Sequence, residues 1–138
     1  MLFYSELIGK KVYSENQHFL GILRDFIFLY EDNPKITKII CEKQKLRHVI
    51  PILSLKQMNN AVAVRKDPKN HGPQAHELTA ANVLLDKQII DLGGNKVVRV
   101  NDIVFQDSPT LSISGIDIGI LGILRRLNLE SIFQRIIR

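Results

Sequence analysis

Tryptophan is absent from this chain, and cysteine occurs once, as Cys41. A single cysteine cannot close an intramolecular disulfide, and it cannot supply a zinc site without several histidines nearby. Of the four histidines only His71 and His76 are close in sequence, whereas a metal site needs three or four converging ligands. We therefore expect no disulfide framework, no metal site and no cofactor, and a buried, inert thiol at Cys41.

Long apolar runs and a targeting signal are also missing. No run approaches the roughly 20 apolar residues that a membrane-spanning helix needs. Residues 1–6 place an acidic residue where a signal peptide carries positive charge, and no small-residue cleavage site follows. These absences predict a cytoplasmic protein without a transmembrane segment. The lack of tryptophan also disfavours contact with a membrane surface.

The charge of the chain is moderately positive, with 19 Lys and Arg against 14 Asp and Glu among 138 residues. Nucleic-acid-binding proteins usually gather their basic residues on one face, often with aromatic residues between them. Here the lysines are spread through turns, as in residues 43–45. The charge pattern therefore favours a solvated surface, and nucleic acid is the less favoured partner.

An internal repeat is the strongest signal in the chain. Residues 7–28 match residues 84–105 at a constant shift of 77 positions, without a gap. Between the copies, residues 65–74 are polar and contain two prolines and a glycine, which is the composition of a linker. We therefore predict a duplication. Its predicted parts are a first repeat over residues 1–64, a linker over residues 65–77 and a second repeat over residues 78–138.

Within each copy the hydrophobic period is mostly that of β-strands. Isolated hairpins cannot bury a face, whereas a meander of five or so short strands can curl into a small barrel with a filled interior. In the second copy, Gly93 and Gly94 predict a tight hairpin. The strands expected in the first copy cover residues 10–14, 19–30, 35–42, 46–51 and 61–64, with a helical turn near residues 54–57.

Two aspartates mark a shared irregularity. In both copies the alternation of apolar residues changes face, at Arg24-Asp25 and at Asn101-Asp102. One extra residue in each strand, a β-bulge, returns the apolar residues on both sides to the core and bends the strand. We therefore assign Asp25 and Asp102 to structural positions, where their carboxylates hold the amides of the bulge, and not to metal or catalytic chemistry.

The copies diverge towards the C-terminus. From Ile118 the apolar spacing predicts a helix that ends at Asn128, followed by a second helix over residues 130–137. No counterpart of the first copy's closing strand is recognisable, so the second barrel is expected to be unfinished. The helical face has three interpretations: packing on its own sheet, docking onto a partner, or contact with a membrane surface. The residues assigned to partner binding are Leu121, Leu124, Arg125, Arg126, Ile132, Phe133 and Ile136.

Several of these segments resemble the PRC-barrel domain, which is named for the H subunit of the photosynthetic reaction centre and also occurs in ribosome maturation factors. In the first copy the resemblance rests on residues 7–12, Gly21, Asp25 and residues 48–51. The second copy resembles tandem PRC-barrel regions that precede a domain like the intracellular N-terminal domain of bacterial magnesium transporters. The segments that carry this second likeness are residues 84–91, 96–102 and 115–127. The resemblance implies a mainly β fold with two small barrels in tandem, the second followed by a C-terminal α-helical pair.

We expect a non-catalytic adaptor or regulatory module. It would bind another protein or domain, or a second copy of itself as a homodimer, through its barrels and C-terminal helices. The resemblance implies a prokaryotic protein and a link to magnesium transport. The alternative is an RNA- or ribosome-associated factor, for which binding should weaken steeply with salt. An enzyme would need a site that the sequence does not offer, since even residues 93–96 lack the spacing of a phosphate-binding loop.

Overall fold

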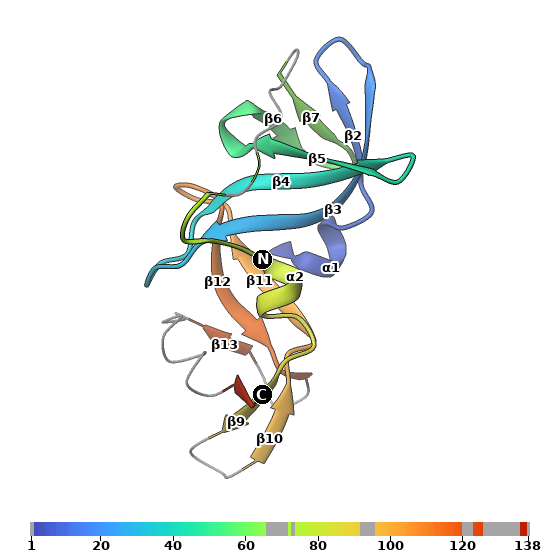
Figure 1. Ribbon diagram of the computed structural model, residues 1–138. Coiled ribbons are helices and arrows are strands. Elements are labelled where there is room, and N and C mark those ends of the chain that lie inside the picture. Colours follow the sequence, from blue (N-terminus) through green and yellow to red (C-terminus); the bar gives the residue numbers. More distant parts are fainter. Residues whose placement is uncertain are drawn as a thin grey trace.

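The computed structural model describes residues 2–65, 72, 74–91, 96–119, 123–125 and 136–137. Strands dominate these residues, which confirms the mainly β class (Figure 1). The elements before the linker are β1 (Leu2–Phe3), α1 (Tyr4–Leu7), β2 (Lys11–Ser14), β3 (Phe19–Leu29), β4 (Ile36–Lys43), β5 (Leu46–Pro51), the 3-10 turn η1 (Ile52–Ser54), β6 (Leu55–Met58) and β7 (Val62–Val64). Those after it are β8 (Glu77–Thr79), α2 (Ala80–Val83), β9 (Gln88–Asp91), β10 (Lys96–Arg99), β11 (Asp102–Gln106), β12 (Ser112–Asp117), β13 (Ile123–Arg125) and β14 (Ile136–Ile137).

The strands form three sheets. The largest is seven-stranded, with the order β5-β4-β3-β2-β7-β6 and with β8 paired to β3 beside that path. The second repeat contributes the sheet β10-β9-β14 and most of the sheet β1-β11-β12-β13. Among the described residues each sheet has strands at its ends that pair on one side, and no sheet closes on itself. Two tandem barrels therefore stay a prediction.

The duplication is visible in the bounds of the strands. A shift of 77 positions carries β2 onto β9, and it carries β3 onto the span of β10 and β11 together. The pairing register is also shared, because Lys11 lies opposite Ile22 and Gln88 lies opposite Arg99. The sequence repeat therefore corresponds to a repeat in backbone structure.

The bulge takes a different form in each repeat. In the first, β3 runs through Arg24 and shifts its register against β4 between Leu23 and Asp25. In the second, β10 ends at Arg99 and β11 begins at Asp102, so the long strand is interrupted. The extra residue thus bends strand β3 in the first repeat. In the second repeat it separates β10 from β11.

The two repeats exchange their N-terminal segments. Strand β1 pairs with β11 of the second repeat, and β8 pairs with β3 of the first, both antiparallel. The short helices α1 and α2 follow these strands and lie between the upper and lower halves of the molecule in Figure 1. Each repeat therefore extends a sheet of the other.

A pseudo-two-fold axis relates the repeats. The amide of Ile36 donates to the carbonyl of Leu111 at 3.0 Å, and the amide of Ile113 donates to the carbonyl of Pro34 at 2.8 Å. Lys35 and Ser112, which lie between these partners and are themselves equivalent residues, form an isolated antiparallel bridge. If the two repeats are exchanged, the Ile36–Leu111 hydrogen bond takes the place of the Ile113–Pro34 hydrogen bond, and the Lys35–Ser112 bridge is unchanged. The pseudo-two-fold axis therefore passes through this bridge.

One hydrophobic cluster includes side chains of both repeats. Its centre is aromatic, with the ring centroids of Phe26 and Phe105 4.9 Å apart and Tyr4 against both rings. Burial of this apolar surface holds the halves together, because hydrophobic stabilisation scales with the area removed from water. Other members are Leu23, Phe28 and Ile39 from the first repeat and Ile89, Ile103 and Ile116 from the second.

The C-terminal expectations need correction. Residues 123–125 form β13 and residues 136–137 form β14, so the expectation of helices is wrong at these positions. Short apolar runs fit both the helical and the strand period, and the edges of β12 and β9 offer backbone hydrogen-bonding partners. Residues 120–122 and 126–135 of the expected helices lie outside the described residues.

The second repeat also has a counterpart of the first repeat's closing strand. Strand β13 pairs with β12 through Leu124 and Ile116, as β5 pairs with β4 through Ile50 and Ile39, the residue equivalent to Ile116. The expectation that no such strand follows is therefore wrong. The signal was missed because β13 is short and stands in an apolar run that also fits a helix.

Candidate functional site

Asp25 lies at the bulge of β3 and is 5% exposed. Its Oδ1 accepts hydrogen bonds from the amide of Phe26 at 2.7 Å and from the hydroxyl of Tyr4 at 3.1 Å. The amide of Ala81, in α2 of the other repeat, donates to the same oxygen at 3.2 Å. Burial raises the pKa of Asp25, and these hydrogen bonds act in the opposite direction by favouring the carboxylate. Asp25 thus connects the bulge of one repeat to the helical turn of the other.

Asp102 makes the reciprocal connection. Its Oδ1 accepts the amides of Ile103 at 2.9 Å and of Ser5 at 3.0 Å, and its Oδ2 accepts the hydroxyl of Ser5. Ser5 and Ala81 are each the second residue of their helix, α1 and α2. The two carboxylates therefore bind amides at the same position of their respective helices, across the pseudo-two-fold axis.

The arrangement of the two aspartates supports a structural role. Oδ1 of Asp25 and both carboxylate oxygens of Asp102 accept hydrogen bonds from backbone amides or hydroxyls of the protein. In the part of the chain that the structure describes, no group of three or more His, Cys, Asp and Glu is placed to hold a metal ion. The hydrogen bonds of Asp25 and Asp102 therefore fix one repeat against the other.

A buried ion pair adds to this connection. Lys38 of β4 lies with its Nζ 2.5 Å from Oε1 and 2.6 Å from Oε2 of Glu77 in β8. The hydroxyl of Thr37 donates to Glu77 as well. Burial acts to raise the pKa of Glu77, but the hydrogen bonds from Lys38, Thr37 and the amide of Gln74 outweigh it, so this pKa lies below its usual value. The pair fixes the exchanged strand β8 to the first repeat.

We expect Glu77→Gln to lower the free energy of unfolding by about 2 kcal/mol at neutral pH, because Lys38 keeps a buried charge without its carboxylate partner. The unfolded pKa is 4.5 and the folded pKa is lower. The stabilisation from Glu77 is therefore complete above pH 4.5 and is lost as the pH falls through the folded pKa. Urea unfolding across this pH range should show that acidification lowers the free energy of unfolding less in the variant than in the wild type. Equal decreases in the two proteins would contradict the role of the pair.

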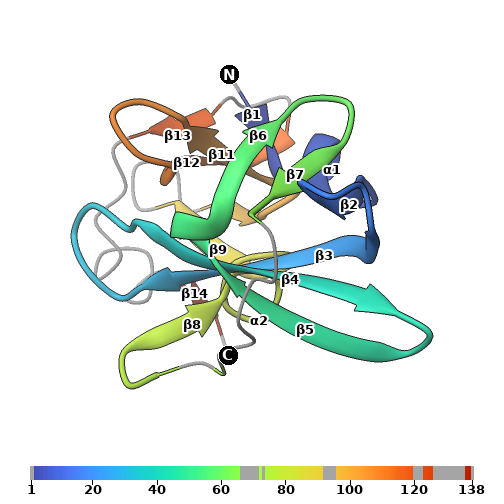
Figure 2. The same cartoon turned by 90° about the horizontal axis from the view of Figure 1, so that it is seen from above.

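The β4–β5 hairpin projects from one end of the molecule (Figure 2). Its two-residue loop, Gln44 and Lys45, has φ angles of 52° and 67°, the left-handed conformation of a type I′ turn. Lys43, Lys45 and Arg47 are exposed around this loop. The Nε of Arg47 donates to Oε2 of Glu42 at 3.2 Å. Three cations therefore accompany a single carboxylate at the tip.

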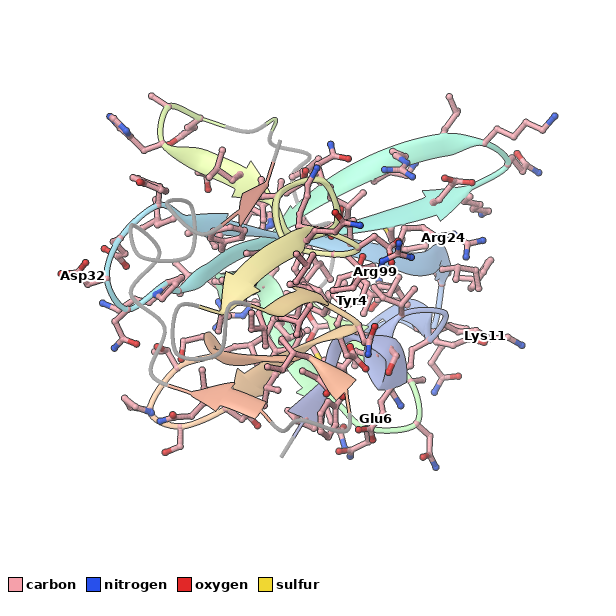
Figure 3. The ribbon with its side chains drawn as sticks, turned by 90° about the horizontal axis from the view of Figure 1, so that it is seen from below. Tyr4, Glu6, Lys11, Arg24, Asp32 and Arg99 are labelled. Atoms are coloured by element: carbon pink, nitrogen blue, oxygen red, sulfur yellow. The ribbon has the colours of Figure 1, made fainter. Side chains whose placement is uncertain are left out.

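Further charges are separated along the sheet. Lys11 is in the same cross-strand row as Ile22, Glu42 and Arg47, so its exposed side chain emerges on the face that carries Arg47. Figure 3 places Lys11 and Arg24 towards the end from which the hairpin projects and Asp32 at the opposite end. The β3–β4 turn with Asp32 is acidic, and the β4–β5 turn is basic.

Strand β5 lies at the end of its sheet. Among the described strands it pairs only with β4. Leu46, the first residue of β5, is 65% exposed. Phe19 of β3 is also exposed, with the Nζ of Lys43 5.7 Å from its ring centre. An edge strand of this kind can accept an added strand from another chain.

The residues predicted to bind a partner fall elsewhere. Leu121, Arg126, Ile132 and Phe133 lie outside the described residues. Leu124 and Arg125 are in β13, and Ile136 is in β14, where the backbone is described. Their assignment to partner binding stays a prediction.

The basic hairpin was missed because its lysines were interpreted as dispersed charges. A signal was present: residues 43–48 contain Lys43, Lys45, Arg47 and His48 on two strands expected to form a hairpin. Antiparallel pairing brings such residues together at one tip, so counting charge by hairpin would have found the cluster.

Cys41 is buried, as the sequence predicts. Burial raises the pKa of its thiol to about 11, so the unreactive protonated form dominates at neutral pH. His48 and His76 are exposed, and His71 lies outside the described residues.

Comparison with known proteins adds no assignment. No protein-family model matches the chain, and no curated protein matches it. In the described ranges no helix has the length and apolar character needed to cross a membrane. The likeness to PRC-barrel proteins therefore stays a prediction.

Proposed function

We propose that the protein is a non-catalytic binding module of the tandem PRC-barrel type that docks an acidic, extended segment of another protein. The observation that carries this proposal is the β4–β5 hairpin, where the terminal strand β5 begins at the exposed Leu46, between Lys43, Lys45 and Arg47. Backbone groups at the edge would supply affinity, and the cations would select acidic side chains.

The exposed Leu46 favours a protein partner. A phosphate backbone makes no favourable contact with an aliphatic side chain. An added peptide strand can cover Leu46 with an apolar residue of its own. The resemblance of the second repeat suggests a domain like the intracellular N-terminal domain of magnesium transporters as such a partner.

RNA is the second candidate, because the same cations would release counterions from phosphates. Single-stranded RNA is usually held by bases stacked on exposed aromatic rings. At this end of the molecule Phe19 is exposed, but Lys43 already lies over its ring. The hairpin therefore favours protein over RNA.

The test compares two single charge reversals in the intact chain, Lys45→Glu and its control Lys35→Glu. Both lysines are exposed, and they lie beyond opposite ends of β4. Each variant, with the wild type, is used to capture partners from a cell extract before and after ribonuclease treatment. We expect Lys45→Glu to reduce capture of a ribonuclease-resistant acidic protein at least tenfold, and Lys35→Glu to leave it unchanged.

Two outcomes would overturn the proposal. Equal capture by the wild type and Lys45→Glu would show that the hairpin is not the docking surface. Capture that disappears on ribonuclease treatment and falls steeply with salt would assign the hairpin to RNA instead.

A further inference from the structure

The contacts between the two repeats are reciprocal, and each of them could also form between the first repeat of one copy and the second repeat of another. Strand β1 completes β11 and β8 completes β3, while Asp25 and Asp102 bind amides at the same position of the short helices in the opposite repeat. We propose that two copies of this chain form a dimer by exchanging repeats, so that the first repeat of each copy packs on the second repeat of the other.

The exchanged dimer would preserve the contacts that join the repeats in the monomer. The Lys38–Glu77 ion pair, the Phe26–Phe105 ring contact and the bridge between Lys35 and Ser112 would each form twice, between chains. Each chain would pass from its first to its second repeat between β7, which ends at Val64, and β8, which begins at Glu77. Exchange of identical elements is a low-cost route to dimers for this reason.

Concentration decides between the two forms. A short tether holds the repeats of one chain at an effective concentration on the order of 1 mM, which favours the monomer in dilute solution. Refolding at a chain concentration of about 1 mM should therefore give the exchanged dimer alongside the monomer, and refolding in dilute solution should give the monomer alone. The dimer would present two basic hairpins, but its formation does not depend on what the hairpins bind.

Two charge reversals make the exchange selective. In a Lys38→Glu chain the new carboxylate faces Glu77, and in a Glu77→Lys chain the new ammonium faces Lys38, so both closed monomers contain a like-charge pair. In a mixed dimer with exchanged repeats, each first repeat faces a second repeat of opposite charge, and both ion pairs are restored. The two variants should therefore form a mixed dimer in preference to either alone.

The experiment refolds the two variants separately and together at about 1 mM, and native mass spectrometry measures the products. The double variant Lys38→Glu/Glu77→Lys restores the pair within one chain and is the control for folding. We expect the mixture to yield a species of twice the 15.8 kDa chain mass that contains one copy of each variant. Its melting temperature should approach that of the double variant.

A second measurement needs no substitution. Wild-type chains with natural nitrogen and with nitrogen-15 are refolded together at about 1 mM, and a mixed dimer is sought by its intermediate mass. Only 15.8 kDa species in both experiments would overturn the proposal. A mixed dimer of wild-type chains that Lys38→Glu and Glu77→Lys do not favour over the separate variants would also overturn it, because that dimer would use another surface.

Discussion

Phe105→Ala should lower the free energy of unfolding by about 4 kcal/mol, and it should do so for both repeats together. Phe105 belongs to the second repeat and is 2% exposed. Its ring centre lies 4.9 Å from that of Phe26 and 6.4 Å from that of Tyr4, both in the first repeat. Removing the ring leaves a cavity between the repeats, so the whole cluster loses stability.

The chain offers a convenient probe for this prediction. It has no tryptophan and three tyrosines, Tyr4, Tyr13 and Tyr30, all in the first repeat. Tyrosine fluorescence therefore reports unfolding of the first repeat, while far-ultraviolet circular dichroism reports both. The two urea transitions of Phe105→Ala should coincide and move together.

Val97→Ala, at a half-exposed position of β10, is the control and should change stability by less than about 0.5 kcal/mol. A tyrosine transition that stays at its wild-type midpoint would show that the repeats unfold separately.

Gly21→Ala should cost at least about 4 kcal/mol, because two separate penalties meet at this position. Gly21 in β3 has a φ of +140°, which side chains with a Cβ rarely adopt. An added Cβ would also lie 2.6 Å from the carbonyl oxygen and 2.8 Å from the carbonyl carbon of Glu42 in β4. These are backbone atoms, so the two strands would have to separate at the base of the basic hairpin.

Gly9→Ala separates the two penalties. Gly9 has a φ of +94°, but no atom lies within 4 Å of the position that a Cβ would occupy. Its substitution should therefore cost only the conformational penalty of about 1 kcal/mol. Thermal unfolding of both variants measures the difference. Equal losses would contradict the close approach of β3 to Glu42.

Local features of this fold could be predicted from the sequence. The shift of 77 positions gave the equivalence of β2 with β9 and of β3 with β10 and β11, because each copy keeps the same alternation and the same turn positions. The flip of alternation at Arg24-Asp25 located the register shift in β3. These features depend on neighbouring residues, whose spacing the sequence states directly.

The exchange of segments could not be predicted in this way. Leu2 pairs with Phe105, and Leu78 pairs with Phe28, but hydrophobic period does not tell which of two similar repeats a strand will join. The same limit applies to β13, where Ile123 and Leu124 fit a helix as well as a strand and the neighbouring β12 decides. In both cases the pairing is determined by contacts with strands distant in sequence, which the local pattern of residues does not encode.

The candidate site was predicted in part. The sequence placed Asp25 and Asp102 beside the amides of a bulge, and each indeed accepts the amide of the following residue. It did not indicate Ala81 and Ser5, whose amides come from the other repeat. The basic hairpin tip was overlooked because its charges become neighbours only after β4 and β5 pair.

Nuclear Overhauser contacts measure the exchange of segments most directly. In dilute solution the cross-strand contacts of β1 should run to β11, with Leu2 beside Phe105, and those of β8 should run to β3, with Leu78 beside Phe28. Observation of both sets in the monomer would support two repeats that complete each other around a pseudo-two-fold axis. Contacts of β1 and β8 only within their own repeats would contradict the account.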